Sequence, residues 1–366
     1  MLNLINTFKT YQLYLPTLFL LIKMGGGLMQ LVAYGAQDAF LTGNPEITFF
    51  KVVYRRHTNF AMESILQDFN GSGTRKTATI SRNGDLITNC WLEGCVGGTD
   101  KIESIDLEIG GQRIDKHYGD WMNVWTELSC PPGKIEGKKD MNDSGDIVPL
   151  EFFFCRNPGL ALPLIALQYH EVKLTFNMMA GTDTTSLALY VDYIYLDTDE
   201  RRRFAQVQHN MLIDQLQQQE VNNSGNIRLN FNHPCKELVW TTASDAEAAA
   251  ALTANASDIW LNTSKTTLKL NGHDRFASRG PRYFKQVQKY QHHTNCPNAI
   301  NGNDGTNVNV YSFALKPEEH QPSGTCNFSR IDNAALNTEN YVKRVYAVNY
   351  NVLRIMSGMG GLAFSN

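Results

Sequence analysis

The chain has 366 residues, of which 42% are hydrophobic and 19% charged, so it is long and apolar enough for two domains with sizeable cores. Its formal net charge is only -3, and its basic clusters at residues 55–57 and 201–203 are short. Tight binding to nucleic acid needs a larger basic patch or stripe. The composition therefore argues against direct nucleic-acid binding.

The seven cysteines are scattered, odd in number and without a CxxC pair. Disulfide frameworks and zinc sites show tighter spacing, so we expect free thiols in a reducing compartment. A Cys90–Cys95 pair across a turn is the one disulfide alternative.

Residues 1–27 read as an N-terminal extension. Its apolar run at residues 13–22 contains Pro16 and is shorter than the roughly 20 residues of a membrane span. Lys23-Met24-Gly25 offers no small-residue cleavage site, which argues against a signal peptide. Either a start codon was assigned too far upstream, which we favour, or the run is an apolar arm that packs on a neighbour.

Short segments with period-two apolar patterns follow, separated by clusters of Gly, Asn, Asp and Pro. This spacing predicts an all-β sandwich or barrel, without distinguishing a jelly roll from an immunoglobulin-like sandwich. The predicted strands are residues 77–80, 102–109, 172–176, 227–231, 268–270 and 308–313.

An internal sequence repeat indicates one fold used twice. Residues 107–125 and 268–287 each read as a strand, a Gly-containing turn, a polar stretch and an aromatic helical turn. Each half then ends in a long run of Val, Tyr, Ile and Leu, at residues 187–201 and 341–355. Trp121 and Trp125 lie in the first helical turn, where we favour a core role over a stacking platform for sugar or bases.

Between the halves, residues 200–220 place apolar side chains at helical spacing and predict a bridging amphipathic helix over 201–220. The turn-prone residues 222–225 mark the predicted domain boundary. Arg201 to Arg203 are read equally well as a partner contact or as solvated charges. We predict a surface loop at residues 130–149, a short helix or poorly ordered loop within 241–267, and a flexible tail at 358–361.

No catalytic motif or cofactor-binding motif is found. His292, His293 and His320 lie near Glu318 and Glu319, but adjacent histidines on a strand would point to opposite faces. We therefore predict satisfied polar residues at strand ends, and no metal site. Six Asn-X-Ser/Thr sequons are candidate glycosylation sites, although chance matches are expected in so Asn-rich a chain: Asn70, Asn142, Asn222, Asn255, Asn262 and Asn327.

Three separated segments carry a family resemblance. Residues 27–65 (GLMQLVAYGAQDAFLTGNPEITFFKVVYRRHTNFAMESI), 191–204 (VDYIYLDTDERRRF) and 290–336, with the following YVKRVYAVNYNVLRIMSGMGGLAFSN, resemble the major capsid proteins of nucleocytoplasmic large DNA viruses. These are the algal-virus, iridovirus and mimivirus type. Such proteins begin close to Met24 of this chain.

The resemblance implies two consecutive eight-stranded jelly rolls, at residues 28–200 and 221–366, joined by the helix. It implies a homotrimer that forms a pseudo-hexameric capsomer of an icosahedral double-stranded DNA virus, assembled in host cytoplasm. Implied partners are further copies, minor capsid and penton proteins, and the inner viral membrane near the N-terminus. Alternative functions are a jelly-roll carbohydrate-binding or minor decoration protein and, with less support, a cupin-like metalloenzyme.

Overall fold

The computed structural model describes residues 26–143, 146–242, 265–296 and 308–364. Internal contacts divide the chain after His57 into two units. In the first unit the described residues 26–57 form two short helices and no strand, and they expose many apolar side chains. Strands begin only at Phe60, later than the predicted start of the first domain at residue 28. The two helices are α2 (Gly26–Val32) and α3 (Asp38–Thr42).

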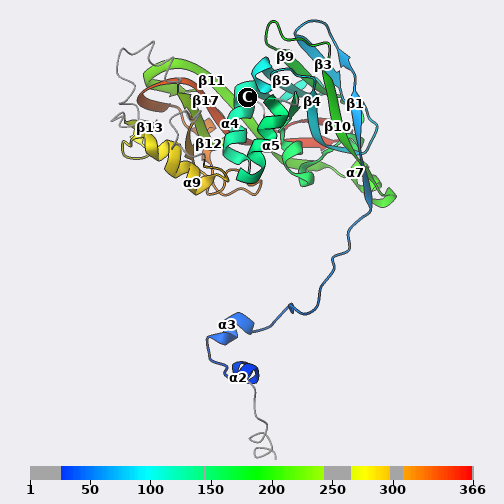
Figure 1. The fold of residues 1–366 in the computed structure, drawn as a ribbon, viewed down its shortest axis with the longest axis vertical. Coiled ribbons are helices and arrows are strands. Elements are labelled where there is room, and N and C mark those ends of the chain that lie inside the picture. The colour runs from blue at the N-terminus through cyan, green and yellow to red at the C-terminus, as the bar shows by residue number, and fades with distance from the viewer. Residues whose placement is uncertain (1–25, 144–145, 243–264, 297–307, 365–366) are drawn as a thin grey trace, which may run out of the picture. The chain divides into compact units, whose positions relative to one another are not determined.

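The second unit begins with a sandwich of two five-stranded antiparallel sheets (Figure 1). Along β9 and β10 alternate residues point into a shared apolar core, as the period-two pattern predicts. In the first sheet the order is β1 (Phe60–Gln67), β10 (Ala188–Leu196), β4 (Leu86–Glu93), β7 (Ile147–Pro149), with β8 (Leu162–Pro163) beside β4. In the second sheet the order is β2 (Phe69–Asn70), β3 (Arg75–Thr79), β9 (Val172–Met178), β5 (Ile102–Ile109), β6 (Gln112–Tyr118).

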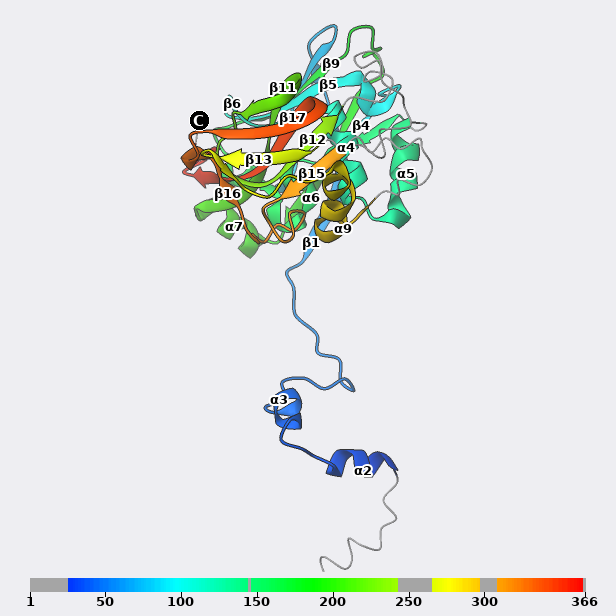
Figure 2. The same ribbon diagram turned by 90° about the vertical axis from the view of Figure 1, so that its left-hand side faces the viewer.

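The C-terminal half forms one eight-stranded sheet that folds into two layers through its two longest strands (Figure 2). One part of β17 pairs with β12, which pairs with β15, and another part pairs with β13, which pairs with β14. Its strands are β11 (His209–Leu229), β12 (Pro234–Thr242), β13 (Thr266–Leu270), β14 (His273–Asp274), β15 (Val308–Ser312), β16 (Cys326–Asn327), β17 (Ala334–Met356) and β18 (Met359–Leu362).

The strand orders of the two halves correspond. The order β11-β17-β12-β15 repeats β1-β10-β4-β7, and β11-β17-β13-β14 repeats β3-β9-β5-β6. The predicted use of one fold twice is therefore confirmed, with the difference that single long strands serve both layers of the second half.

The two hairpins of the internal repeat, β5–β6 and β13–β14, have the same type of turn. Gly110 and Gly111 have φ of 58° and 81°, and Asn271 and Gly272 have φ of 52° and 82°. Two consecutive left-handed residues match a type I′ hairpin turn, which suits the twist of the flanking strands. Each hairpin leads into a helix: α4 (Gly119–Ser129) in the first half, and the π-helical turn η5 (Tyr283–Val287) with α9 (Gln288–His292) in the second.

The predicted linker helix over 201–220 is wrong beyond its first residues. Helix α7 spans Thr198–Gln206, and β11 follows from His209. Backbone pairing of β11 with β17, from His209↔Ile355 to Leu229↔Ala334, overrides the local helical spacing. The turn-prone residues 222–225 lie at register shifts within β11, where Asn222 and Gly225 have φ of 49° and 91°.

Two further segments differ from expectation. The predicted loop at 130–149 contains α5 (Pro132–Asp143), and the predicted flexible tail forms β18. The tail is ordered because Ser357 and Gly358 make a tight turn with φ of 54° and 80°, so the chain pairs back onto β17. The remaining short helices are η1 (Gly98–Lys101), α6 (Phe153–Arg156), η2 (Pro158–Leu160), η3 (Leu164–Ala166) and η7 (Phe328–Arg330).

Most of the predicted segment 241–267 lies outside the described residues, as do residues 1–25. Across the described ranges, helices are too short or too polar to cross a membrane.

Candidate functional site

The main candidate site is the junction at which helix α4 of the first half packs on the second half. Trp121 and Trp125 are 1% and 4% exposed, which confirms their predicted core role. The Trp121 ring lies 5.7 Å from that of Trp125 and 5.1 Å from that of Tyr346 on β17. Val239 of β12 and Val310 of β15 belong to the same cluster. Helix α4 thus covers the outer face of the second half's β11-β17-β12-β15 layer.

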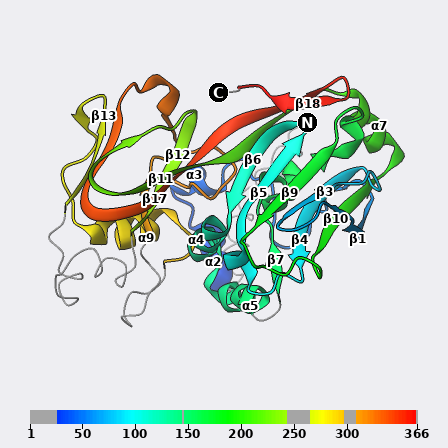
Figure 3. The same ribbon diagram turned by 90° about the horizontal axis from the view of Figure 1, so that it is seen from above.

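A second connection is the ribbon formed by β11 and β17 (Figure 3). At one end, Ile213, Leu353 and Ile355 are buried in the core of the first half. At the other end, Ile227 and Ala334 are buried in the core of the second half. One continuous pair of strands therefore enters both cores, which resists bending between the halves.

Buried polar groups complete the junction. The Asp115 carboxylate lies 3.0 Å from the His117 imidazole and accepts a 3.0 Å hydrogen bond from the backbone N–H of Leu216 on β11. The ammonium group of Lys236, 1% exposed, lies 3.1 Å from the Asp214 carboxylate. Breaking one partner of such a buried pair is costly because the other charge stays desolvated. The polar contacts that join the two halves here are the hydrogen bond from Leu216 to Asp115 and the ion pair of Arg156 on α6 with Asp214 on β11, at 3.9 Å.

The histidines of the predicted cluster lie at a helix end and in loops, and not on a strand. His292 ends α9, and its ring Nδ1 lies 3.0 Å from the Leu315 carbonyl oxygen. His293, the residue after the helix, lies between two carboxylates, with Nε2 2.9 Å from Glu237 and Nδ1 2.8 Å from Glu318. Burial alone would lower the pKa of His293, but the two carboxylates outweigh burial and raise it to about 9.

The contacts of His293 are those of an ion-paired residue that links two segments, and not those of a metal ligand. His293 is held by β12 through Glu237 and by the loop after β15 through Glu318. Hydrogen bonds from His293 and Thr294 lower the pKa of Glu318 although burial opposes them. Within the described ranges, no group of three or more His, Cys, Asp or Glu side chains has a metal-binding arrangement.

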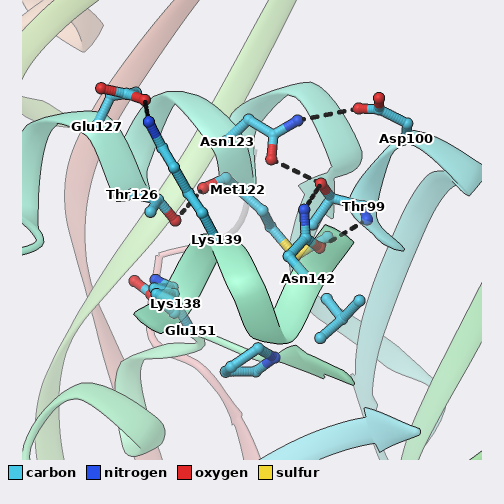
Figure 4. A pocket seen from close by; sticks show the side chains of 12 residues that line it. Thr99, Asp100, Met122, Asn123, Thr126, Glu127, Lys138, Lys139, Asn142 and Glu151 are labelled. Carbon is cyan, nitrogen blue, oxygen red and sulfur yellow. Dashed lines mark hydrogen bonds and ion pairs between the residues drawn. The ribbon is translucent and has the colours of Figure 1, made fainter. Parts of the chain in front are cut away.

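A pocket of about 300 Å³ lies between α4 and α5 (Figure 4). The Asn142 amide oxygen accepts a 2.9 Å hydrogen bond from the backbone N–H of Thr99, and its nitrogen donates to the Thr99 hydroxyl at 3.2 Å. Lys139 pairs with Glu127 at 2.8 Å, and Lys138 pairs with Glu151. The polar side chains that line this pocket therefore hold α5 against the rest of the first half.

The sequons differ in accessibility. Asn70, Asn222 and Asn327 are exposed, whereas the Asn142 side chain is half-buried and hydrogen bonded to Thr99. Asn255 and Asn262 lie outside the described residues.

The cysteines are free thiols in the structure. Cys90 and Cys95 do not pair with each other; a hydrogen bond with Cys155, together with burial, raises the pKa of Cys90. Cys296 is exposed.

Of the basic residues 201–203, Arg201 pairs with the Asp85 carboxylate at 2.9 Å.

Sequence reasoning missed the buried charges of β12. Their only signal is the pair Lys236-Glu237 within an otherwise apolar strand.

Residues 48–197 match the family model for the major capsid protein N-terminus, and residues 200–361 match that for the large eukaryotic DNA virus major capsid protein. The chain belongs to the family of large eukaryotic DNA virus major capsid proteins. The major capsid protein of Pyramimonas orientalis virus is 52% identical over 94% of this chain and all of the relative. That of Paramecium bursaria Chlorella virus 1 is 44% identical with the same coverage.

Solved structures of this family have the same fold. A chain in the quasi-atomic model of the PBCV-1 virus capsid is 40% identical, with a TM-score of 0.73 over 87% of this chain and 100% of that one. The Faustovirus major capsid protein is 10% identical, with a TM-score of 0.69 over 88% and 94%, and shares the fold alone. The double jelly roll is therefore confirmed. As a capsid family member, this protein is a structural component of the viral capsid shell.

Proposed function

We propose that this capsid protein assembles with copies of itself into homotrimers, each a pseudo-hexameric capsomer of an icosahedral large double-stranded DNA virus. The observation that carries the proposal is the repeated strand order of the two halves. Two similar lobes per chain give six lobes per trimer. Closed cyclic symmetry is the common outcome for homo-oligomers, and a six-lobed ring can tile a flat facet.

The junction supports this function because a capsomer needs lobes held at a fixed angle. Helix α4 and the β11–β17 ribbon bury apolar side chains across the junction. Polar contacts of Asp115 with Leu216 and of Arg156 with Asp214 also join the halves. The near-neutral net charge of -3 also suits close packing of like subunits.

We also propose that the chain is not an enzyme and needs no cofactor. Its two buried charge clusters, at His293 and at Lys236, consist of groups paired with one another, an arrangement that serves folding. Stoichiometric iron, manganese or zinc in the purified protein would contradict this proposal.

Further proposed partners are minor capsid and penton proteins, with the segment near residues 25–30 at the inward base near the inner membrane. Assembly is proposed in host cytoplasm, without direct nucleic-acid contact.

Any N-linked sugar is expected at Asn70, Asn222 or Asn327, because these residues are exposed, and not at Asn142. A carbohydrate-binding or decoration role is the alternative; it predicts a minor virion component.

Cryo-electron microscopy of purified particles tests the proposed function. The expected reconstruction shows capsomers with six density lobes and threefold symmetry, each lobe pair fitted by one chain, and this chain as the most abundant virion protein. Density for this chain at isolated positions on a shell built of another protein would support the decoration role and refute the proposal.

A further inference from the structure

The junction within one chain combines two parts, a helix and the outer face of a sheet. The helix is α4, which presents Trp121, Trp125 and Leu128 at spacings of four and three residues. The sheet face belongs to the layer β11-β17-β12-β15. Since the fold is used twice, the chain contains a second helix and a second sheet face of the same kinds.

The second sheet face is the outer face of β1-β10-β4-β7. Along β1, Phe60, Met62 and Leu66 are 57%, 51% and 51% exposed. Leu66 is in register with Tyr190 of β10, which is in register with Trp91 of β4, and the Tyr190 and Trp91 rings stack at 5.7 Å. Antiparallel sheets normally turn polar side chains to water, so this apolar face indicates an interaction surface.

The second helix is the η5–α9 segment. It places Tyr283, Val287 and Tyr290 at the same spacings of four and three residues as the apolar residues of α4. Whereas Trp121 and Trp125 are buried, Val287 is 40% exposed and Tyr290 is 80% exposed. The second helix therefore displays apolar side chains at two of the three positions that the first helix uses for docking, whereas Tyr283 packs against the second core.

We propose that these two surfaces bind each other between chains: the η5–α9 helix of one copy packs on the outer β1-β10-β4-β7 face of the next copy. This inference rests on the proposed trimer. In this arrangement the contact between subunits has the same form as the contact that α4 makes within each chain.

Position and charge support a second copy as the occupant. Strands β1 and β10 lie on one side of the residue 58–366 unit, and α9 lies on the other (Figures 1 and 3). A contact between different surfaces is heterologous, and it forms a closed ring when the rotation closes. The sheet face carries the acidic Asp192 and Glu93, while the basic Arg282 directly precedes the helical segment and Lys285 lies within it. Opposite charges on the two surfaces favour their association.

The test is native mass spectrometry of the full chain carrying Leu66→Asp on the sheet face or Tyr290→Asp on the helix. Both residues are exposed, so folding should be unchanged, as checked by circular dichroism and thermal unfolding. Met179→Asp, at a 48% exposed residue on neither surface, is the matched control. We expect the midpoint concentration for trimer formation to rise at least about 100-fold in each test variant. The control should match wild type.

Mixing the two variants sharpens the test. The Leu66→Asp chain keeps an intact helix and the Tyr290→Asp chain keeps an intact sheet face, so an equimolar mixture should form heterodimers that cannot close into a ring. Folded variants that stay trimeric like wild type would overturn the inference and leave the proposed function standing. Trimer loss in only one variant would also overturn it, because the sheet face and the helix would then have different partners. So would absence of the heterodimer. A wild-type chain that is not trimeric would refute the proposed function itself.

Discussion

Replacing Trp121 by alanine should loosen the two halves of the chain from each other. A buried aromatic side chain of this size covers about 150–250 Å², worth roughly 4–6 kcal/mol at about 25 cal/mol per Å². Measured Trp→Ala changes in cores cost about 3–5 kcal/mol, and we expect this range because Trp121 is 1% exposed and contacts both Trp125 and Tyr346.

Guanidinium denaturation followed by circular dichroism measures the free energy of unfolding, and hydrogen exchange locates the loss. Faster exchange is expected in α4 and in β15 across the junction. Trp240→Ala is the matched control, since Trp240 is 2% exposed but packs on Phe284 inside the second half. A loss below about 1 kcal/mol for Trp121→Ala, or exchange changes indistinguishable from those of Trp240→Ala, would refute the role of α4 as the junction.

Three other outcomes are expected. Because the folded pKa of His293 is about 9 and the unfolded value about 6.5, its contribution to stability is fully present below pH 6.5 and is lost as pH rises through 9. The free energy of unfolding should fall by about 3 kcal/mol across that window, and His293→Gln should flatten the profile. Gly119→Ala should destabilise the fold by about 2 kcal/mol or more, because the new Cβ would lie 2.3 Å from a backbone carbonyl oxygen, whereas Gly133→Ala meets no atom within 4 Å; equal melting temperatures would contradict this. A maleimide should label Cys296 first in the folded protein, and mass mapping that finds a buried thiol labelled faster would count against the described packing.

Local sequence signals predicted the features that depend on neighbouring residues. The glycine turn at residues 110–111 and the Asn-Gly turn at 271–272 require left-handed backbone, so both hairpins were visible in the sequence. Trp121 and Trp125 share one helical face, which indicated their common burial. The family resemblance supplied the choice of a jelly roll, which composition alone left open.

Features that depend on distant partners were not predictable in this way. The first part of β11 reads as a helix in the sequence because apolar residues such as Leu212 and Leu216 are four residues apart. Its strand partner β17 lies far along the chain, as the hydrogen bond of Gln217 with Asn349 across 132 residues shows. Helix α5 has the Gly- and Lys-rich composition of a loop, yet Lys138 and Lys139 pair with carboxylates outside the helix. The His293 site likewise needs residues from three separate segments.

The proposed capsomer is tested most directly by the native mass of the purified full chain at the concentration at which capsids assemble. With a monomer of 41.2 kDa, the proposed homotrimer has a mass of 3 × 41.2, or about 124 kDa. That species should be the dominant one. A stable monomer at 41.2 kDa, or a dimer at twice that mass, would contradict the pseudo-hexameric capsomer.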